Sequence, residues 1–381
     1  MINKRLVMIP GPTPTINRIN DQMGRPTCAH GDPDFVVDYK NTIDRIGKMF
    51  DCSGQAFIIS GSGSLALEMA IANNLKKGDN LLVISHGMFG DRFIDIAERK
   101  GINTDVLRAP WGSIVPVDEI NKQLSIKKYD AVTVSHVDTS TAVLAPIAEI
   151  GEMIHKEHKD TIYIVDGVAA TAGARSYVDK MHIDVLITAS QKALGVAPGL
   201  AIVFAGNKSL KRRETLGRIP EYYVDYEKWI PIMQDPAKYY ATPPVNLIWA
   251  LQEALNVIDE EGIENRYDRH EKQGAAMRKA LESLGFTVTA EKGVQAPTLT
   301  NCFYMEGIED QAFRTAVLEE GIMIAGALGE YAGKAFRIGH MGNADLHDLT
   351  AALSAIERAL VKIGVDIQLG KSIGVFLKEM S

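Results

Sequence analysis

Six short apolar runs between residues 55 and 205 alternate with segments of helical periodicity. The runs are rich in Val, Ile and Leu with little polar alternation, which is typical of strands buried on both faces. They are Ala56–Ser60, Leu81–Ser85, Ala131–Ser135, Ile162–Asp166, Val185–Ser190 and Leu200–Ala205. Helices are expected between them at Leu65–Lys76, Phe89–Lys100 and Ile147–His158. This alternation predicts an α/β fold in which a mostly parallel sheet lies between helices.

The pattern changes after residue 205. Arg218–Pro244 is rich in aromatic residues and proline and is interpreted as a long irregular connection. Two long helices follow, separated near Gly262, and the rest of the chain mixes strands with helices. The expected elements are helices at Val245–Glu261, Glu264–Leu284, Asp310–Glu320 and Leu346–Ile363, and strands at Thr298–Met305 and Ala335–Ile338. We therefore predict an N-terminal segment (1–16) that packs with a small C-terminal domain (263–381), and a large domain (17–262) between them.

Composition excludes several classes of protein. The 381 residues carry a formal net charge of −7, so the chain lacks the basic surface on which nucleic-acid binding depends. The densest basic run, Lys208–Arg213, is interpreted as a solvated helix face. No apolar stretch of membrane-spanning length is present, and three widely spaced cysteines favour a reducing compartment. We expect a cytoplasmic protein with no membrane partner and no metal site.

Polar residues that close the strands are candidates for a binding site, because ligands of parallel sheets bind beyond the carboxyl ends of the strands. The first strand ends in Ser60-Gly61-Ser62-Gly63-Ser64, directly before a helix. Small residues at a helix N-terminus suit a phosphate group. An ordinary capped turn explains this segment equally well when it is taken alone.

Two further strand ends carry ionisable side chains. Asp166 closes a buried strand, where a carboxylate is costly unless a cation or hydrogen-bond donors meet it. A protonated pyridine nitrogen is one such cation, and a helix cap is the alternative. Lys192 follows the next strand and precedes an apolar segment. A desolvated lysine has a lowered pKa and can form a Schiff base, whereas an ordinary lysine would extend its amine to solvent.

The phosphate turn, the strand-end aspartate and the strand-end lysine follow one another in this order along the chain. In this order of features the chain resembles the class V aminotransferases of pyridoxal-phosphate (PLP) fold type I, in particular the alanine–glyoxylate and serine–pyruvate (serine–glyoxylate) branch. The resemblance runs from Pro10-Gly11-Pro12 to Arg337-Ile338-Gly339. It implies a large domain with a mostly parallel seven-stranded sheet between helices, and a smaller C-terminal α/β domain.

The resemblance also implies a role for each matching residue around the cofactor. Lys192 would hold PLP as an internal aldimine, Asp166 would pair with the pyridine nitrogen, and Gln191 would contact the cofactor. The phosphate would lie on Ser62, Gly63 and Ser64.

Further roles concern the ring, the substrate and a second subunit. Phe89 would stack on the pyridine ring, and Ser140 would hydrogen-bond its oxygen side. Tyr239 and Thr242 would reach the phosphate of the neighbouring subunit in a homodimer with shared active sites. Arg337 would bind the substrate carboxylate as a bidentate fork.

The implied activity is a ping-pong aminotransfer from a small amino acid, alanine or serine, to a small 2-oxo acid, glyoxylate or pyruvate. A carboxylate clamp with no second evident cation favours small substrates. The alternatives are a phosphonate-handling transaminase (2-aminoethylphosphonate–pyruvate type), a cysteine desulfurase-like lyase, and a binding protein that keeps the fold without catalysis. A desulfurase needs an exposed, mobile cysteine, and Cys302 is the candidate in the small domain. His136, which closes a strand, is interpreted as a packed polar residue.

Overall fold

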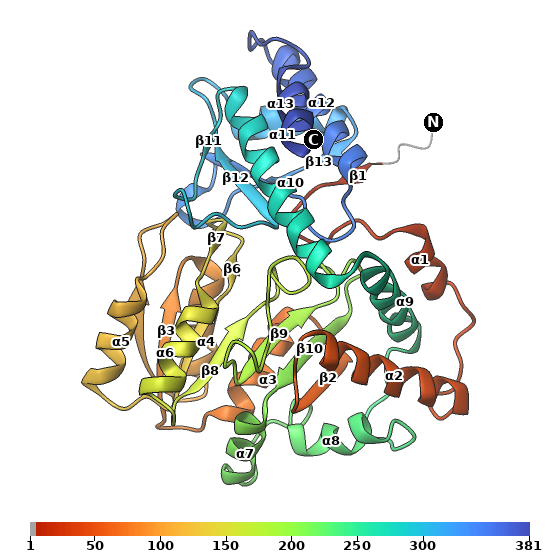
Figure 1. The fold of residues 1–381 in the computed structure, drawn as a ribbon, viewed down its shortest axis with the longest axis vertical. Helices are drawn as coiled ribbons and strands as arrows, with labels where there is room; N and C mark the ends of the chain where they lie inside the picture. Colours follow the sequence, from red (N-terminus) through yellow and green to blue (C-terminus); the bar gives the residue numbers. More distant parts are fainter. Residues whose placement is uncertain (1–4) are drawn as a thin grey trace.

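The computed structural model describes residues 5–381, so the first four residues of the predicted N-terminal segment lie outside the described chain. A large body in the lower part of the view carries the central sheet, and a smaller body lies above it (Figure 1). Each body has its own hydrophobic core. The residue boundaries assigned to the domains stay a prediction.

The central sheet has seven strands, as predicted, and is mostly parallel. Its order is β2 (Gln55–Ser60), β10 (Leu200–Ala205), β9 (Val185–Ala189), β8 (Ile162–Asp166), β5 (Ala131–Ser135), β3 (Asn80–Ser85) and β4 (Asn103–Arg108). Only β10 is antiparallel to its neighbours, with Ala201 opposite Ala189 of β9 and Ile59 of β2. The carboxyl ends of β5, β8 and β9 therefore meet at one edge of the sheet.

Helices surround this sheet (Figure 1). Those that follow its strands are α3 (Gly63–Asn74), α4 (Met88–Arg99), α5 (Val117–Ile126), α6 (Ile147–Glu157) and α7 (Asn207–Thr215), while α1 (Asn17–Met23) and α2 (Pro33–Met49) precede them. The short hairpin of β6 (Val137–Asp138) and β7 (Val143–Leu144) follows β5. The basic run on α7 is not wholly solvated, because the Arg213 side chain is buried and paired with Asp225.

The predicted irregular connection at 218–244 contains a helix, α8 (Tyr226–Gln234). Asp225 caps its N-terminus by accepting a hydrogen bond from the Glu227 backbone N–H. Trp229 is buried in the large core, and its indole donates to the Tyr223 carbonyl. Tyr226 and Trp229 of this segment are core residues, whereas Tyr222 and Tyr239 are exposed.

The smaller body is built on a four-stranded sheet in the order β11 (Thr287–Val288), β12 (Leu299–Phe303), β15 (Ala335–Gly339) and β14 (Ala325–Gly326). Around it lie η1 (Gly329–Tyr331), α11 (Asp310–Glu319), α12 (Leu346–Lys362) and α13 (Lys371–Met380). Strand β1 (Leu6–Val7) pairs with β13 (Ile322–Met323), which brings the start of the chain to this body.

Two long helices connect the bodies. Helix α9 (Val245–Glu261) packs on the large core, and α10 (Ile263–Ser283) runs from the large body into the small one (Figure 1). The break between these two helices at Gly262 agrees with the prediction. Within residues 5–381, no helix combines the length and the apolar character needed to cross a membrane.

Candidate active site

Lys192 lies in the turn after β9, and its side chain is mostly buried. Its Nζ donates a hydrogen bond to the Pro10 carbonyl, and its own carbonyl accepts one from Thr13 Oγ1 at 2.9 Å. Burial, together with the positive charges of Arg337 and Arg92, lowers the pKa of the Lys192 amine to about 8, and the negative charge of Asp166 partly opposes this shift. The amine is therefore partly neutral near pH 7, as a nucleophile or a base must be.

The N-terminal segment covers this lysine. Gly11 has φ +109°, and a Cβ atom at this position would lie 2.6 Å from Lys192 Nζ. Only glycine fits so close an approach in that backbone conformation. The resemblance marked this segment but did not reveal that it touches the lysine, because the contact joins residues 182 positions apart.

Asp166 ends β8 and is buried. Its Oδ1 accepts a hydrogen bond from the Val168 N–H at 2.9 Å, and its Oδ2 accepts a longer one from Ser135 Oγ at 3.4 Å. Burial raises the pKa of the carboxyl group to about 6. A cation placed against Asp166 would favour its ionised form.

The predicted phosphate turn forms the start of α3, and the Ser62 side chain makes no capping hydrogen bond. The N–H groups of the first turn of a helix have no partners within the helix and point toward an incoming anion. A Cβ atom on Gly63 would lie 3.0 Å from Val168 Cγ2. The turn, with Ser62 and Ser64 exposed at its surface, thus adjoins the loop that follows Asp166.

Phe89 and Ser140 are brought together by a residue that sequence reasoning missed, Asp138. Its Oδ2 accepts hydrogen bonds from the N–H groups of Phe89 and Gly90 at 2.9 and 3.1 Å, so it caps α4. Its Oδ1 accepts from the Ser140 hydroxyl at 2.6 Å. Because the single hydroxyl hydrogen of Ser140 points to Asp138, donation to a cofactor oxygen would require this hydrogen to change its acceptor.

Arg337 lies on β15 and is partly buried. Its Nε donates to the Gly326 carbonyl at 2.8 Å and its Nη1 to the Thr139 carbonyl at 3.4 Å. Within residues 5–381, its Nη2 makes no hydrogen bond and the guanidinium has no ion-pair partner. Burial lowers the pKa of Arg337 to about 10, and the charge of Asp138 partly offsets this. Such a guanidinium favours an incoming carboxylate.

Arg92 is a second positively charged residue near Lys192 that the sequence did not single out. Arg92, one turn after Phe89 on α4, is close enough to Lys192 for its charge to lower the pKa of the amine. Its guanidinium lies 4.4 Å from the centre of the Phe89 ring. No carboxylate forms an ion pair with Arg92 in the described part of the chain.

The side chains present fit PLP. Lys192 supplies the amine, Asp166 a carboxylate for a ring nitrogen, and the start of α3 an anion site. Gln191, which precedes the lysine, has a buried Oε1 atom with no hydrogen-bond partner among the described residues. A buried acceptor without a partner is costly, so a bound donor would satisfy it.

Tyr239 and Thr242 lie apart from this group and are exposed. The Tyr239 hydroxyl is 3.3 Å from Thr242 Oγ1, and its ring lies against His30 with centroids 4.9 Å apart. No hydrogen bond joins either residue to Lys192, Asp166 or Arg337. Their expected role at the site of a second subunit stays a prediction.

Cys302 does not meet the requirement for a desulfurase. It lies on β12, pairs opposite Phe336 of β15, and its side chain is fully buried. Burial raises the pKa of its thiol well above the usual range. A protonated, inaccessible thiol cannot accept sulfur from a bound substrate.

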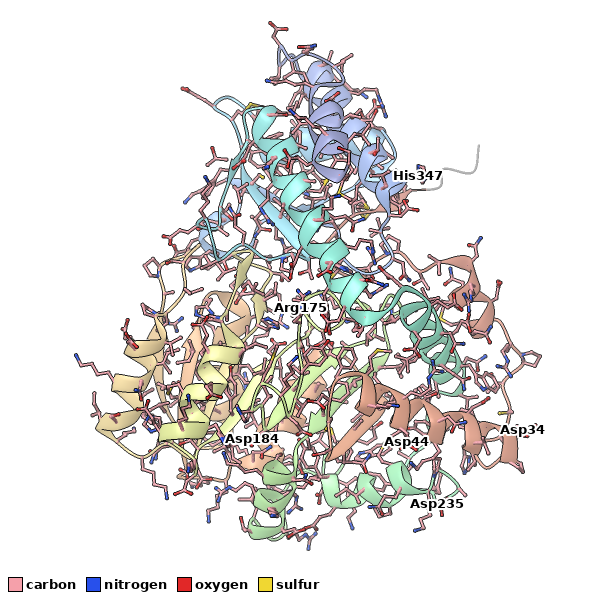
Figure 2. All side chains as sticks on the ribbon, in the orientation of Figure 1. Asp34, Asp44, Arg175, Asp184, Asp235 and His347 are labelled. Carbon is pink, nitrogen blue, oxygen red and sulfur yellow. The ribbon has the colours of Figure 1, made fainter. Side chains whose placement is uncertain are left out.

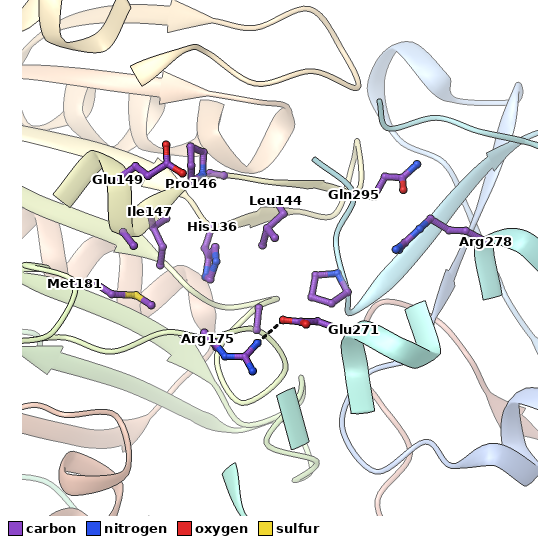
Figure 3. Close-up of a pocket in the computed structure, with 14 residues that line it drawn as sticks. His136, Leu144, Pro146, Ile147, Glu149, Arg175, Met181, Glu271, Arg278 and Gln295 are labelled. Atoms are coloured by element: carbon purple, nitrogen blue, oxygen red, sulfur yellow. Dashed lines mark hydrogen bonds and ion pairs between the residues drawn. The ribbon is translucent and has the colours of Figure 1, made fainter. Parts of the chain in front are cut away.

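His136 faces a separate cavity of about 300 Å³ at the junction of the two bodies (Figure 3). Its Nδ1 lies 3.2 Å from Ser176 Oγ, and burial lowers the pKa of the imidazole to about 3. Arg175 and Arg278 line the same cavity, and Arg175 is paired with Glu271 of α10. None of the predicted site residues lines this cavity, which agrees with a packed His136.

Comparison with known proteins identifies the family. Residues 30–338 match the family model described as aminotransferase class V. The chain belongs to the class V aminotransferases. Members of this family depend on PLP in general, and the match covers Lys192, Asp166 and Arg337.

Individual class V relatives are similar along almost the whole chain. An uncharacterized aminotransferase of Methanocaldococcus jannaschii is 37% identical, over 96% of this chain and 95% of the relative. Alanine–glyoxylate aminotransferase 1 of Saccharomyces cerevisiae is 32% identical, over 88% and 91%. The crystal structure of ureidoglycine–glyoxylate aminotransferase from Bacillus subtilis superimposes with a TM-score of 0.93 at 28% identity, over 99% and 98%. The predicted PLP fold type I is thereby confirmed.

Proposed function

We propose that this class V aminotransferase moves the amino group of alanine or serine to glyoxylate or pyruvate, with PLP held by Lys192. One observation carries the proposal: Arg337 and Asp166 lie close enough to Lys192 for their charges to act on its pKa. A base, a carboxylate for a ring nitrogen and a cation for a substrate carboxylate are the groups that aminotransfer needs. The names of the yeast and Bacillus relatives support glyoxylate as the acceptor.

Each side chain has a distinct task. Bound PLP supplies an electron sink for the pair left when the substrate C–H bond breaks. Arg337 binds the substrate carboxylate and so orients the α-hydrogen toward Lys192. The neutral Lys192 amine takes that proton and later returns it, acting first as general base and then as general acid. Asp166, when ionised, keeps the ring nitrogen protonated.

The visible absorption spectrum of the protein with PLP tests this proposal. L-Alanine or L-serine should discharge the band of the lysine-bound cofactor, and glyoxylate or pyruvate should restore it. Lys192→Ala should lack the band and the activity, although PLP can still bind it noncovalently. A band that neither amino acid discharges would refute the proposed donors while leaving the cofactor in place.

Arg92 favours a second candidate, an amino donor with two carboxylates such as aspartate. Its unpaired guanidinium near Lys192 could meet the side-chain carboxylate while Arg337 holds the α-carboxylate. Arg92→Met should then lower kcat/KM for aspartate at least about tenfold more than for alanine, as expected for one lost charged hydrogen bond. Arg99→Met is the matched control, because Arg99 lies on the same helix and pairs with exposed Asp95. An equal loss of kcat/KM for aspartate and for alanine would refute the role of Arg92 in selecting aspartate.

A further inference from the structure

One buried cation outside the proposed chemistry lies at the junction of the two bodies. Arg266 is in the first turn of α10, and only 1% of its side chain is exposed. Desolvating a guanidinium is costly unless its donors find acceptors. Glu261 Oε2 accepts from Nη1 at 2.7 Å, and the same carboxylate also pairs with Arg269.

The remaining donors of Arg266 reach three separate loops. Its Nε donates to the Ala172 carbonyl at 3.2 Å, on the loop that follows Asp166. Its Nη2 donates to the Ala193 carbonyl at 2.9 Å, directly after Lys192. The same Nη2 donates to Asn343 Oδ1 at 3.0 Å, on the loop that follows β15 and Arg337.

These loops also touch one another. Gly195 has φ +71°, and a Cβ atom there would lie 2.5 Å from Asn343 Nδ2. A Cβ atom on Gly173 would lie 3.0 Å from the Cβ of Ala193. In such close packing, a shift of one loop displaces the others.

We propose that Arg266 is a positioning residue that fixes Asp166, Lys192 and Arg337 relative to one another across the junction of the two bodies. This role rests on the proposed aminotransferase function, in which those three side chains must act on one bound substrate. The planar guanidinium presents donors in a fixed fork, whereas a lysine ammonium is a point charge that cannot reach the same acceptors. Misplacement of reacting groups by about 1 Å can cost about 100-fold in rate.

Neighbouring arginines do not duplicate this arrangement. Arg269 donates to the Gly342 and Ala344 carbonyls and so reaches only the loop after Arg337. Arg175, labelled in Figure 2 at the junction, ties the loop after Asp166 to α10 through Glu264, Asp268 and Glu271, and it is partly exposed. Of the three, Arg266 alone contacts all three loops.

The test compares Arg266→Lys with Arg213→Lys in the full-length protein. Arg213 is an equally buried arginine, with 1% of its side chain exposed, that donates to Asp225 at 3.0 and 2.8 Å. Its partners lie on the connection after α7 rather than on the loops of the site. For each variant we would measure urea unfolding of the apoprotein, PLP affinity, kcat and KM. We would also measure the pH at which the rate of PLP capture by the apoprotein is half-maximal, which is called the pH midpoint below.

Both substitutions should destabilise the apoprotein to a similar extent. Arg266→Lys alone should weaken PLP binding at least tenfold, raise the pH midpoint above the wild-type value, and lower kcat about 10- to 100-fold. Arg213→Lys should match the wild type in these three measurements. The role is overturned if Arg266→Lys loses stability but keeps wild-type PLP affinity, midpoint and kcat.

A second variant covers the case in which Arg266→Lys does not fold. Asn343→Ala removes only the acceptor on the loop after Arg337, so KM for the amino donor should rise several-fold with the pH midpoint unchanged. An unchanged KM in a folded Asn343→Ala protein would also overturn the role. A wild-type protein that fails to bind PLP or to transaminate refutes the proposed function itself, and this is visible before any variant is compared.

Discussion

The surroundings of Lys192 shift the pKa of its amine. Burial and two nearby arginines lower the pKa of its amine from 10.5 to about 8. The Asp166 carboxyl group is shifted in the opposite direction, to about 6, because burial penalises the charged form of an acid as it does that of a base. Both pKa values are thereby brought toward neutral pH, where each group can change its protonation state at small cost in free energy.

PLP capture by the apoprotein should therefore depend on pH with a midpoint near the pKa of Lys192, about 8. The neutral amine attacks the aldehyde, so the capture rate should rise about tenfold per pH unit below the midpoint and level off above it. Stopped-flow absorbance across this pH range measures the rate.

Arg337→Met is the matched variant for this measurement. Removing a nearby positive charge should raise the pKa of the amine and move the midpoint to higher pH. A wild-type midpoint at or above the ordinary lysine value of 10.5 would contradict the electrostatic account of the site.

The sequence singles out the candidate site residues that close strands, but not those whose partners are distant in the chain. Asp166 and Lys192 could be predicted because an ionisable group at the end of a buried strand is conspicuous. Asp138 caps a helix by accepting from Phe89, 49 positions earlier in the chain, and nothing local in its sequence indicates this. The positions of Gly11 and Arg92 near Lys192 likewise depend on tertiary structure.

Elements with two buried faces were predicted within one or two residues of their bounds. Among the elements that were not predicted, two bury few of their side chains. β4 (Asn103–Arg108) is the edge strand of the large sheet, and its mixed polar sequence has no continuous apolar run. α5 (Val117–Ile126) buries only Ile120 and Leu124, too few for a clear helical period. An element at the edge of the fold needs fewer apolar side chains, so its sequence shows a weaker hydrophobic period.

Helix α13 contributes a buried side chain to the core of the small body. On α13, Phe376 is fully buried, and Ser372 donates to the buried Glu357 carboxylate at 2.6 Å through its hydroxyl and at 2.7 Å through its backbone N–H. Helix α13 packs against α10 and α12. It therefore stabilises the small body from outside the region matched by the family model.

Phe376→Ala should lower the free energy of unfolding by about 3–5 kcal/mol, because it removes a buried aromatic ring and leaves a cavity. Urea unfolding of the apoprotein measures the change. Leu377→Ala, at the next position of the helix, is the control: its side chain is 43% exposed, and the loss should be much smaller. Equal losses would show that α13 does not pack as described.

At the scale of the whole molecule, the prediction for Tyr239 and Thr242, both exposed in the single chain, is that a second subunit covers them. In the expected homodimer, each site would combine Lys192 of one subunit with this pair from the other. Their exposure in one chain agrees with that arrangement, since Tyr239 is 62% exposed.

Mixed dimers test this sharing. Lys192→Ala and the double variant Tyr239→Phe/Thr242→Ala should each be inactive or weak. In a mixed dimer of the two, one site receives both defects and the other receives neither, so co-refolding the variants should restore activity. No recovery, with mixed dimers shown to form by mass spectrometry, would mean that each subunit builds its site alone.

The pairing of Leu6 with Ile322 imposes an order of events on protein synthesis. The ribosome releases the first strand early, but its partner strand emerges only after most of the chain has been made. Most residues of the large core lie between these two strands in the sequence, so a nascent chain can form much of this core while the Lys192 amine is still uncovered. The segment that closes over the lysine is thus translated long before its partner strand and is among the last parts of the chain to reach its final position.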